Sequence, residues 1–268
     1  MKKALFVTDL YCDVQGRNYY EEDLFLTNEL KRHFNIIISH PTQAIEFVDD
    51  VDFVILRNTG PIVNYKKEYD FFTKTVLKKG INTFNSFDGK ADMKGKDYML
   101  ELTKENFPVI PTIDNVENIE KLGKLKNYIV KPKNGADSVG IKILEKKEIK
   151  HKDISGNIIQ PFLDFEYEIS FYYINKNFQY ALYAPEKSKR WKLDSFIPNE
   201  KDLNFANKFI EWNNITRGIT RVDACSLKDG SLLLIELEDL NPYLSLDSID
   251  KKTKKKFVAN LVKALKEI

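Results

Sequence analysis

Cysteine, histidine and arginine are all scarce in this chain of 268 residues, which contains two, three and six of them. Cys12 and Cys225 lie far apart and have no metal-ligand spacing around them, so we expect no disulfide framework and a reducing compartment. Only six of the 42 basic residues are Arg, so Lys supplies most of the surface charge. Each Arg is therefore a stronger candidate for a position that needs a planar, bidentate donor.

Long apolar runs are also missing. No stretch approaches the ~18 apolar residues of a membrane span, and the run Ala4–Val7 is broken at once by Thr8 and Asp9, so we expect no secretory leader. A net charge of +2 gives no reason to expect a nucleic-acid or membrane partner. The basic run 251–256 precedes an apolar stripe, which favours a docked terminal helix over a membrane-surface helix. We expect a cytoplasmic protein of two or three subdomains.

The first 90 residues alternate between strand and helix patterns. Short apolar runs predict strands over residues 3–8, 35–39, 51–57 and 82–85. Helical spacing predicts helices over about 20–33 and 65–79, and Gly80 is a typical stop after the second. Strands that alternate with helices form parallel βαβ units, so residues 1–90 should form an open α/β domain.

The rest of the chain is richer in strands. A polar connection leads to a helix over about 95–105, and a smaller subdomain is expected over 91–157, with strands at 127–131 and 140–144. A larger subdomain is expected over 158–268, with helices over about 203–212 and from about 252. Its strands are predicted at 158–162, 166–174, 178–183, 221–226 and 231–238. Asp229-Gly230 is a strong hairpin signal, so the last two strands should be antiparallel neighbours.

The segment from Tyr128 to Ile141 carries the first chemical signal. A strand delivers Lys131 at its end, and a loop with Gly135, Ser138 and Gly140 turns back into another strand. Such a loop can offer backbone N–H groups to nucleotide phosphates while the Lys supplies a point charge. The same pattern also describes a plain hairpin. It is not a Walker loop, because no helix follows and the Gly-Lys-Ser/Thr ending is absent.

Acidic residues at the last hairpin carry the second signal. Alternate residues of a strand share a face. The side chains of Arg221 and Asp223 should therefore point to one side of their strand, and those of Glu236 and Glu238 to one side of the next strand. Several carboxylates that converge in an interior are costly without a cation. Ligation by oxygen alone, with no His nearby, favours Mg²⁺ over Zn²⁺. The alternative is a solvated acidic face, which the apolar run 232–235 disfavours.

Together these segments resemble the ATP-grasp family from about Asn85 to Asn241. The spacing of 15 residues between Lys96 and Pro111 is similar to the branch of glutathione synthetase and ribosomal-protein glutamate ligases. The resemblance implies an N-terminal α/β (pre-ATP-grasp) domain followed by a two-subdomain ATP-grasp fold with antiparallel sheets. ATP and Mg²⁺, with two ions expected, would bind between the two subdomains.

The resemblance also implies which residues hold the nucleotide. Lys96 and Lys131 would neutralise phosphates, the strand 158–163 would hold adenine, and Glu168 would take the ribose hydroxyls. In the adenine strand, Gln160 stands where Glu is frequent, and Phe162 would supply backbone and apolar contacts. The full nucleotide set is Lys96, Lys131, Gly135, Ser138, Gln160, Pro161, Phe162 and Glu168.

The metal ligands follow the family pattern at two positions and depart from it at a third. Asp223 and Glu236 match the acids that bridge Mg²⁺, but the usual Glu-x-Asn is here Glu236-Leu-Glu238. Either Glu238 ligates as a carboxylate, or a small shift brings in Asn241. Glu238 follows the strand register and is the preferred ligand.

The resemblance implies a ligase that phosphorylates a substrate carboxylate and joins it to an amine or thiol through an acyl phosphate. Small amino-acid-like or peptide substrates are expected. Arg221 and Arg190 are the first candidates for substrate contact, and Arg57, at the end of a strand, is a weaker one. Two alternatives stay open, a small-molecule kinase like the inositol-phosphate kinases and a non-catalytic ATP-binding module. A homodimer also remains open.

Overall fold

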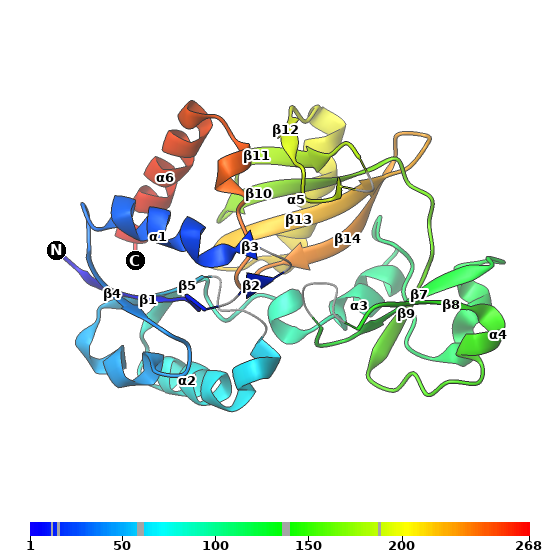
Figure 1. Ribbon diagram of the computed structural model, residues 1–268, viewed down its shortest axis with the longest axis horizontal. Helices are drawn as coiled ribbons and strands as arrows, with labels where there is room; N and C mark the ends of the chain where they lie inside the picture. Colours follow the sequence, from blue (N-terminus) through cyan, green and yellow to red (C-terminus); the bar gives the residue numbers. More distant parts are fainter. Residues whose placement is uncertain (12, 15–16, 58–61, 136–139, 187–188) are drawn as a thin grey trace.

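The computed structural model describes residues 1–11, 13–14, 17–57, 62–135, 140–186 and 189–268. Figure 1 shows an N-terminal sheet and a small sheet at opposite ends of the molecule, with a larger sheet between and above them. The expected mixed architecture, a parallel sheet followed by two antiparallel sheets, is confirmed. None of the helices among the described residues is both long and apolar enough to cross a membrane.

The N-terminal sheet has the order β4-β1-β5-β6, and all its pairs are parallel. Its strands are β1 (Lys3–Val7), β4 (Asn35–Ser39), β5 (Phe53–Leu56) and β6 (Asn82–Phe84). Alternate residues of β1 enter different cores: Ala4 and Phe6 pack in one, Leu5 and Val7 in the other. Burial on both faces explains why these strands read as continuous apolar runs.

Helices cover both faces of this sheet. α1 (Tyr19–Leu30) contributes Leu26 and Leu30 to the first core, and α2 (Lys66–Lys78) contributes Phe72 and Val76 to the second. The terminal helix α6 (Lys251–Lys266) packs beside α1 (Figure 1). The expected docking of this helix is confirmed, since Phe257, Leu261 and Leu265 are buried in the first core. A short ribbon, β2 (Asp13–Val14) with β3 (Arg17–Asn18), precedes α1.

The small sheet has the order β8-β7-β9 and is antiparallel. Its strands are β7 (Asn127–Pro132), β8 (Lys142–Glu145) and β9 (Asn157–Pro161), with the helices α3 (Tyr98–Lys104) and α4 (Lys146–Ile149) in the same part of the chain. The expected boundary at residue 158 falls inside β9, whose backbone groups pair with β7. We propose that the small subdomain extends to Pro161, because a strand belongs with the sheet that satisfies its hydrogen bonds.

The large sheet has the order β12-β11-β10-β13-β14 and is antiparallel throughout. Its strands are β10 (Tyr167–Ile174), β11 (Asn177–Ala184), β12 (Asp194–Phe196), β13 (Ile219–Ser226) and β14 (Leu232–Glu238). α5 (Glu200–Asn213) covers one face, where its Phe205 and Phe209 pack with Phe171 and Val222. The polar residues of β10, β13 and β14 therefore point to the opposite face, toward the other two sheets.

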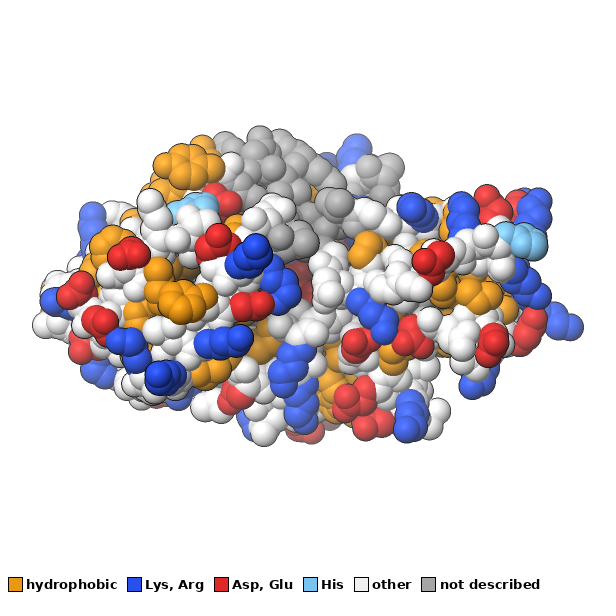
Figure 2. All heavy atoms as spheres, turned by 90° about the horizontal axis from the view of Figure 1, so that it is seen from below, with side chains coloured by type: hydrophobic (Ala, Val, Ile, Leu, Met, Phe, Trp, Pro, Cys, Tyr) orange, Lys and Arg blue, Asp and Glu red, His pale blue; other side chains and the backbone are white. Residues whose placement is uncertain are grey.

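Charged side chains of both signs are interspersed over the face of the molecule in Figure 2. The near balance of 42 basic and 40 acidic residues is consistent with this mixed surface.

Candidate functional site

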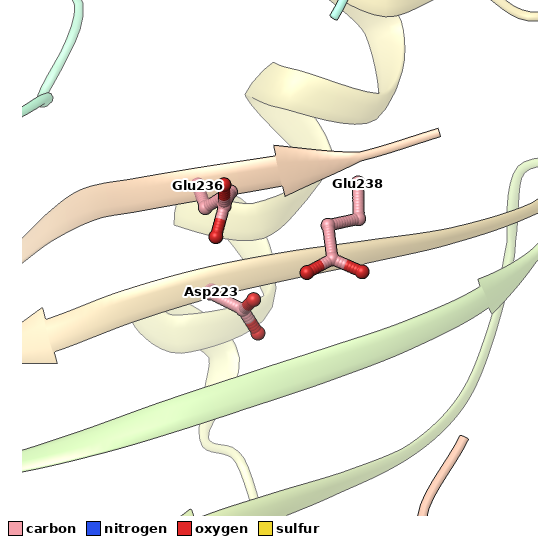
Figure 3. A group of neighbouring side chains, drawn as sticks. All are labelled: Asp223, Glu236 and Glu238. Carbon is pink, nitrogen blue, oxygen red and sulfur yellow. The ribbon is translucent and has the colours of Figure 1, made fainter. Parts of the chain in front are cut away.

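Three carboxylates converge on the open face of the large sheet. Asp223 of β13 and Glu236 and Glu238 of β14 each offer an oxygen within 4.8 Å of the others, and Figure 3 shows the three groups pointing toward one another. Asp223 lies directly opposite Glu236 in the register, and Glu238 lies opposite Arg221. The hairpin that the sequence predicted is therefore present, with both Glu residues on the expected face.

A β-bulge shapes this part of β14. The register passes from Asp223↔Glu236 to Ala224↔Leu234, so Ile235 has no direct partner on β13. As a result Ile235 and Glu236, although adjacent in sequence, both line the same cavity. Bulges of this kind re-aim side chains beside functional sites.

Arg221 provides the counter-charge of the acid cluster. Its Nε donates to Asp223 Oδ1 at 2.9 Å, its Nη2 to Glu238 Oε1 at 2.5 Å, and its Nη1 to the carbonyl oxygen of Tyr243 at 2.9 Å. Even so, burial raises the pKa of Glu238 well above its ordinary value, with Arg221 opposing and Glu236 reinforcing the shift. All three guanidinium nitrogens bond within the chain, so Arg221 organises the acids; it also lines the cavity, and its contact with a substrate stays a prediction.

Lys96 reaches the cluster from the segment just before α3. Its Nζ donates to Glu236 Oε1 and lies 3.2 Å from Asp92 Oδ1. Burial raises the pKa of Asp92 to about 8, and Lys96 opposes that shift. Burial also acts to raise the pKa of Glu236, but Lys96 and Lys131 together hold it below its ordinary value. Lys96 thus tends to keep Glu236 ionised while Asp92 holds the ammonium in place.

Lys131, near the end of β7, faces the same acids. Burial lowers its pKa, and the charge of Glu236 acts in the opposite direction. Glu168 on β10 is a second nearby carboxylate, and its own pKa is raised by burial and lowered in turn by Arg190. Arg190 donates to Glu168 through Nε at 3.2 Å and Nη2 at 3.0 Å, so the predicted ribose acid and the predicted substrate arginine form one ion pair.

A cavity of about 660 Å³ lies over this face of the sheet. It is walled by all three parts of the fold: the N-terminal domain, the small subdomain and the large sheet. Its lining contains acidic, basic and aromatic residues from distant parts of the chain, among them Tyr19, Asp92, Gly135, Glu168, Arg190, Arg221, Asp223, Glu236, Glu238, Asn241 and Tyr243.

The predicted adenine strand is more enclosed than expected. Gln160 is buried, its Nε2 donates to Thr112 Oγ1 at 2.9 Å, and its Oε1 has no hydrogen-bond partner among the described residues. The N–H of Phe162 donates to the carbonyl oxygen of Asn127 at 3.2 Å, so this amide is already used within the chain. Phe162 itself is exposed, while Pro161 is buried at the end of β9.

Solved structures of similar shape cover almost the whole chain. D-cycloserine synthetase DcsG matches with a TM-score of 0.74 at 15% identity, over 97% of this chain and 99% of that one. D-alanine–D-alanine ligase from Bacillus anthracis, complexed with ATP, matches at 0.67 with 16% identity, over 98% and 95%. The ATP-grasp ligase PsnB with its minimal precursor matches at 0.67 with 14% identity, over 97% and 98%. The chain has the ATP-grasp fold. No family model matches the sequence, and no curated protein gives a significant match.

Eight of the predicted site residues line this cavity, and Lys96 and Lys131 lie behind its lining, close to the acids. Lys96, Lys131, Glu168, Asp223 and Glu236 interact directly or through their charges. Asn241 follows the end of β14 and lines the cavity, but it lies beyond the strand that positions the three acids. Ser138 lies outside the described residues, as does Cys12.

Sequence reasoning missed two acids near this cluster: Asp92, which lines the cavity, and Asp239. Asp92 has only its spacing of four residues from Lys96 as a local signal. Asp239 is fully buried and accepts hydrogen bonds from the N–H groups of Ala91 (2.9 Å) and Met93 (2.8 Å). It therefore fixes the segment that carries Asp92. A Cβ on Gly89 would lie 2.2 Å from Asp239 Oδ2, which explains the glycine there.

Arg57 is a buried structural residue, so its candidacy for substrate contact is not supported. Its side chain is only 2% exposed and pairs with Glu22 at 3.1 Å and Asp23 at 3.3 Å. Cys225 is likewise buried, and burial raises the pKa of its thiol to about 11, which is unfavourable for a nucleophile.

Proposed function

We propose that this protein is an ATP- and Mg²⁺-dependent ligase that joins a substrate carboxylate to an amine or thiol. The observation that carries the proposal is the cluster of Asp223, Glu236 and Glu238 in the cavity lining, with Lys96 bonded to Glu236, in a chain with the ATP-grasp fold. Carboxylates that gather with lysines in this way suit a nucleotide phosphate held through divalent cations.

The donor set fits Mg²⁺. All three candidate ligands are carboxylates, and no His or Cys joins them in the cluster that the described residues form. The raised pKa of Glu238 reflects uncompensated negative charge as well as burial, which a bound cation would relieve. We propose Asp223, Glu236 and Glu238 as the ligands of two ions, with Asn241 as the alternative third ligand.

The nucleotide residues follow from the same geometry. We propose that Lys96 and Lys131 neutralise phosphates, that backbone groups near Gly135 cover them, and that Glu168 takes the ribose hydroxyls. We propose that Gln160, Pro161 and Phe162 contact the adenine. The buried Oε1 of Gln160, which has no donor among the described residues, would accept a hydrogen bond from it. Ser138 remains part of the proposed phosphate loop.

The chemistry requires positioning and charge stabilisation rather than a protein nucleophile. ATP, bound with Mg²⁺, would supply the γ-phosphoryl group to the substrate carboxylate and leave as ADP. The amine would then attack the acyl carbon of the acyl phosphate, with release of inorganic phosphate and a proton. Arg221 keeps the acid cluster together, and Asp92 holds Lys96 against Glu236. Arg190 orients Glu168 and is the proposed contact for substrate at the cavity rim.

The lining of the cavity favours a ligase over a polyphosphate kinase. Four of its cationic side chains already pair with carboxylates: Lys66 with Asp70, Lys133 with Asp97, Arg190 with Glu168, and Arg221 with Asp223. A site for an inositol polyphosphate would need surplus positive charge. The similar structures include ligases of small amino acids and of a peptide precursor, so we propose an amino-acid-like or peptide substrate.

Hydroxylamine distinguishes the candidate reactions. The protein is incubated with ATP, Mg²⁺ and mixtures of amino acids and dipeptides, and ADP and hydroxamate are measured. A ligase should form ADP only when carboxylate and amine are both supplied, and hydroxylamine should replace the amine and give a hydroxamate. Stable phosphorylation of an alcohol without hydroxamate would identify a kinase. ATP binding without any turnover would overturn both the ligase and the kinase proposals.

A further inference from the structure

A buried ion-pair network joins the N-terminal domain to the loop that follows β14. Arg57 at the end of β5 and Glu22 and Asp23 of α1 have side chains that are at most 3% exposed. Thr8 donates to Asp23 Oδ2 at 2.5 Å, which completes the network on the side of β1. Burying three charges is costly, so such a network persists only where its members pair with one another and with further polar groups. Arg57 Nε lies 3.3 Å from Asp23 Oδ1 but has no hydrogen-bond partner among the described residues.

The network is satisfied largely by backbone groups of one distant loop. Arg57 Nη1 donates to the carbonyl oxygen of Pro242 at 2.9 Å. Glu22 accepts from the N–H of Leu244 through Oε1 at 2.9 Å and from the N–H of Leu246 through Oε2 at 3.1 Å. These partners are 185 to 224 residues apart in the sequence. The N-terminal domain therefore holds every second residue of the loop 242–246.

The large sheet holds the same loop from its other side, at Tyr243 and Leu244. Arg221, which binds the acid cluster, donates to the carbonyl oxygen of Tyr243 at 2.9 Å. Tyr180 of β11 donates to the carbonyl oxygen of Leu244 at 2.7 Å. The loop is thus fixed from two sides, by Arg57 and Glu22 on one side and by Arg221 and Tyr180 on the other.

Side chains of this loop form part of the cavity wall. Asn241, Tyr243 and Ser245 line the cavity, as does Tyr19, three residues before Glu22 on α1. The rings of Tyr19 and Tyr243 pack with their centres 4.6 Å apart and their planes at 30°. The same helix therefore supplies both the carboxylate that holds the loop and the ring that packs on it.

We infer that Arg57 and Glu22 are positioning residues for the catalytic site. They hold the loop 242–246, so that Tyr243 and the preceding Asn241 form the wall of the substrate site beside the acid cluster. This inference rests on the proposed function for its catalytic consequence, but the holding of the loop is independent of it. Neither residue lines the cavity, so their effect must pass through the loop.

Two variants test the inference. Arg57→Lys keeps one positive charge but loses the fork that reaches Pro242 and both carboxylates together. Glu22→Gln keeps the shape but turns one acceptor oxygen into a donor, which then faces an N–H group. Arg32→Ala and Glu29→Gln are the matched controls, because Arg32 and Glu29 form a surface pair at the end of the same helix.

Hydrogen exchange measures how firmly the loop is held, independently of which reaction the protein catalyses. The amides of Leu244 and Leu246 should exchange at least ~10-fold faster in Glu22→Gln, as expected when the carboxyl that accepts their hydrogen bonds is replaced. They should also exchange faster in Arg57→Lys, because the loop loses its bond at Pro242 and Glu22 loses the guanidinium that holds it. Neither control should change these rates. Unchanged protection of both amides in correctly folded variants would overturn the inference, even if the wild-type protein proved to have no ligase activity.

Kinetics separate positioning from a general loss of structure. With hydroxylamine as acceptor, both variants should bind ATP within about twofold of wild type, while kcat/KM for the carboxylate falls at least ~10-fold. Glu22→Asp, which retains both acceptors on a shorter arm, should recover part of the loss. An equal fall in ATP affinity and in carboxylate kcat/KM would mark a purely structural role and contradict the inference. If the wild-type protein shows no turnover, the proposed function fails. The hydrogen-exchange experiment alone then tests whether Arg57 and Glu22 hold the loop.

Discussion

Asp223 and Glu236 lie directly opposite each other on β13 and β14, and each is held by a cation from a different part of the chain. Arg221 binds Asp223 from the same strand, and Lys96 binds Glu236 from the segment before α3. The acid pair is therefore the point where the large sheet meets the small subdomain. Changes that remove one carboxylate should affect chemistry more than folding.

We expect Asp223→Asn to reduce Mg²⁺-dependent ADP formation by ~100-fold or more, the size of effect seen when one electrostatic contact with a transferring group is lost. The variant keeps the volume of the side chain and one acceptor, so its thermal unfolding should stay near that of wild type. ADP release at saturating ATP measures the loss. Glu166→Gln is the control, since Glu166 is exposed at the start of the same sheet. Full activity of Asp223→Asn would remove this residue from the metal site.

The third ligand can be decided by two substitutions. Glu238 lies within the acid cluster, whereas Asn241 lies beyond the end of β14. We expect Glu238→Gln to raise the Mg²⁺ concentration for half-maximal activity by about 10-fold, because a charged ligand becomes neutral. Asn241→Ala should change it by less than about threefold. The opposite order of effects would make Asn241 the ligand and Glu238 only the partner of Arg221.

Nucleotide affinity should depend on the lysine at the end of β7. We expect Lys131→Met to weaken ATP binding by about 10- to 100-fold, since a charge-assisted contact with a phosphate contributes about 1.5–3 kcal/mol. Titration calorimetry with a non-hydrolysable ATP analogue measures the change. Lys142→Met, on the neighbouring strand β8 and exposed, should bind as wild type does. Equal affinity of the two variants would exclude Lys131 from the phosphate site.

The sequence predicted the features that follow from local periodicity. The alternation of buried and polar residues along β13 and β14 predicted these strands and the shared face of Asp223, Glu236 and Glu238 correctly, because a strand has only two faces. The bulge at Ile235 did not follow from that alternation, since it depends on how β14 pairs with β13. The alternation also does not say which neighbours a side chain contacts along a face, so it did not predict that Arg221 bonds to both Asp223 and Glu238.

Residues whose role depends on long-range partners could not be predicted. Asp239 is buried against the N–H groups of Ala91 and Met93, which precede it by 148 and 146 residues. Arg57 ends a strand at the edge where ligands commonly bind, yet its partners are carboxylates of α1 and a carbonyl of the last loop. A buried ionic residue and a binding residue have the same sequence pattern, and only the tertiary packing separates them.

The stability of the protein should depend on pH through Glu22. Burial raises the pKa of this carboxyl from its ordinary value of 4.5 to about 7, because Arg57 and two backbone N–H groups offset only part of the desolvation cost. Between these two values the folded protein holds a proton that the unfolded chain releases. The contribution of Glu22 is therefore complete below pH 4.5 and is lost as the pH rises through about 7. A shift of this size corresponds to about 3 kcal/mol in the free energy of unfolding.

Urea unfolding of wild type and Glu22→Gln at pH values below, within and above this window measures that contribution. Gln does not titrate, so the variant should be destabilised most at low pH, and the difference from wild type should shrink as the pH rises. Glu29→Gln, on the exposed side of α1, should follow the wild-type profile throughout. A difference between wild type and Glu22→Gln that grows with pH would mean that folding lowers the pKa of Glu22, because the charge of Arg57 would then outweigh the cost of burial.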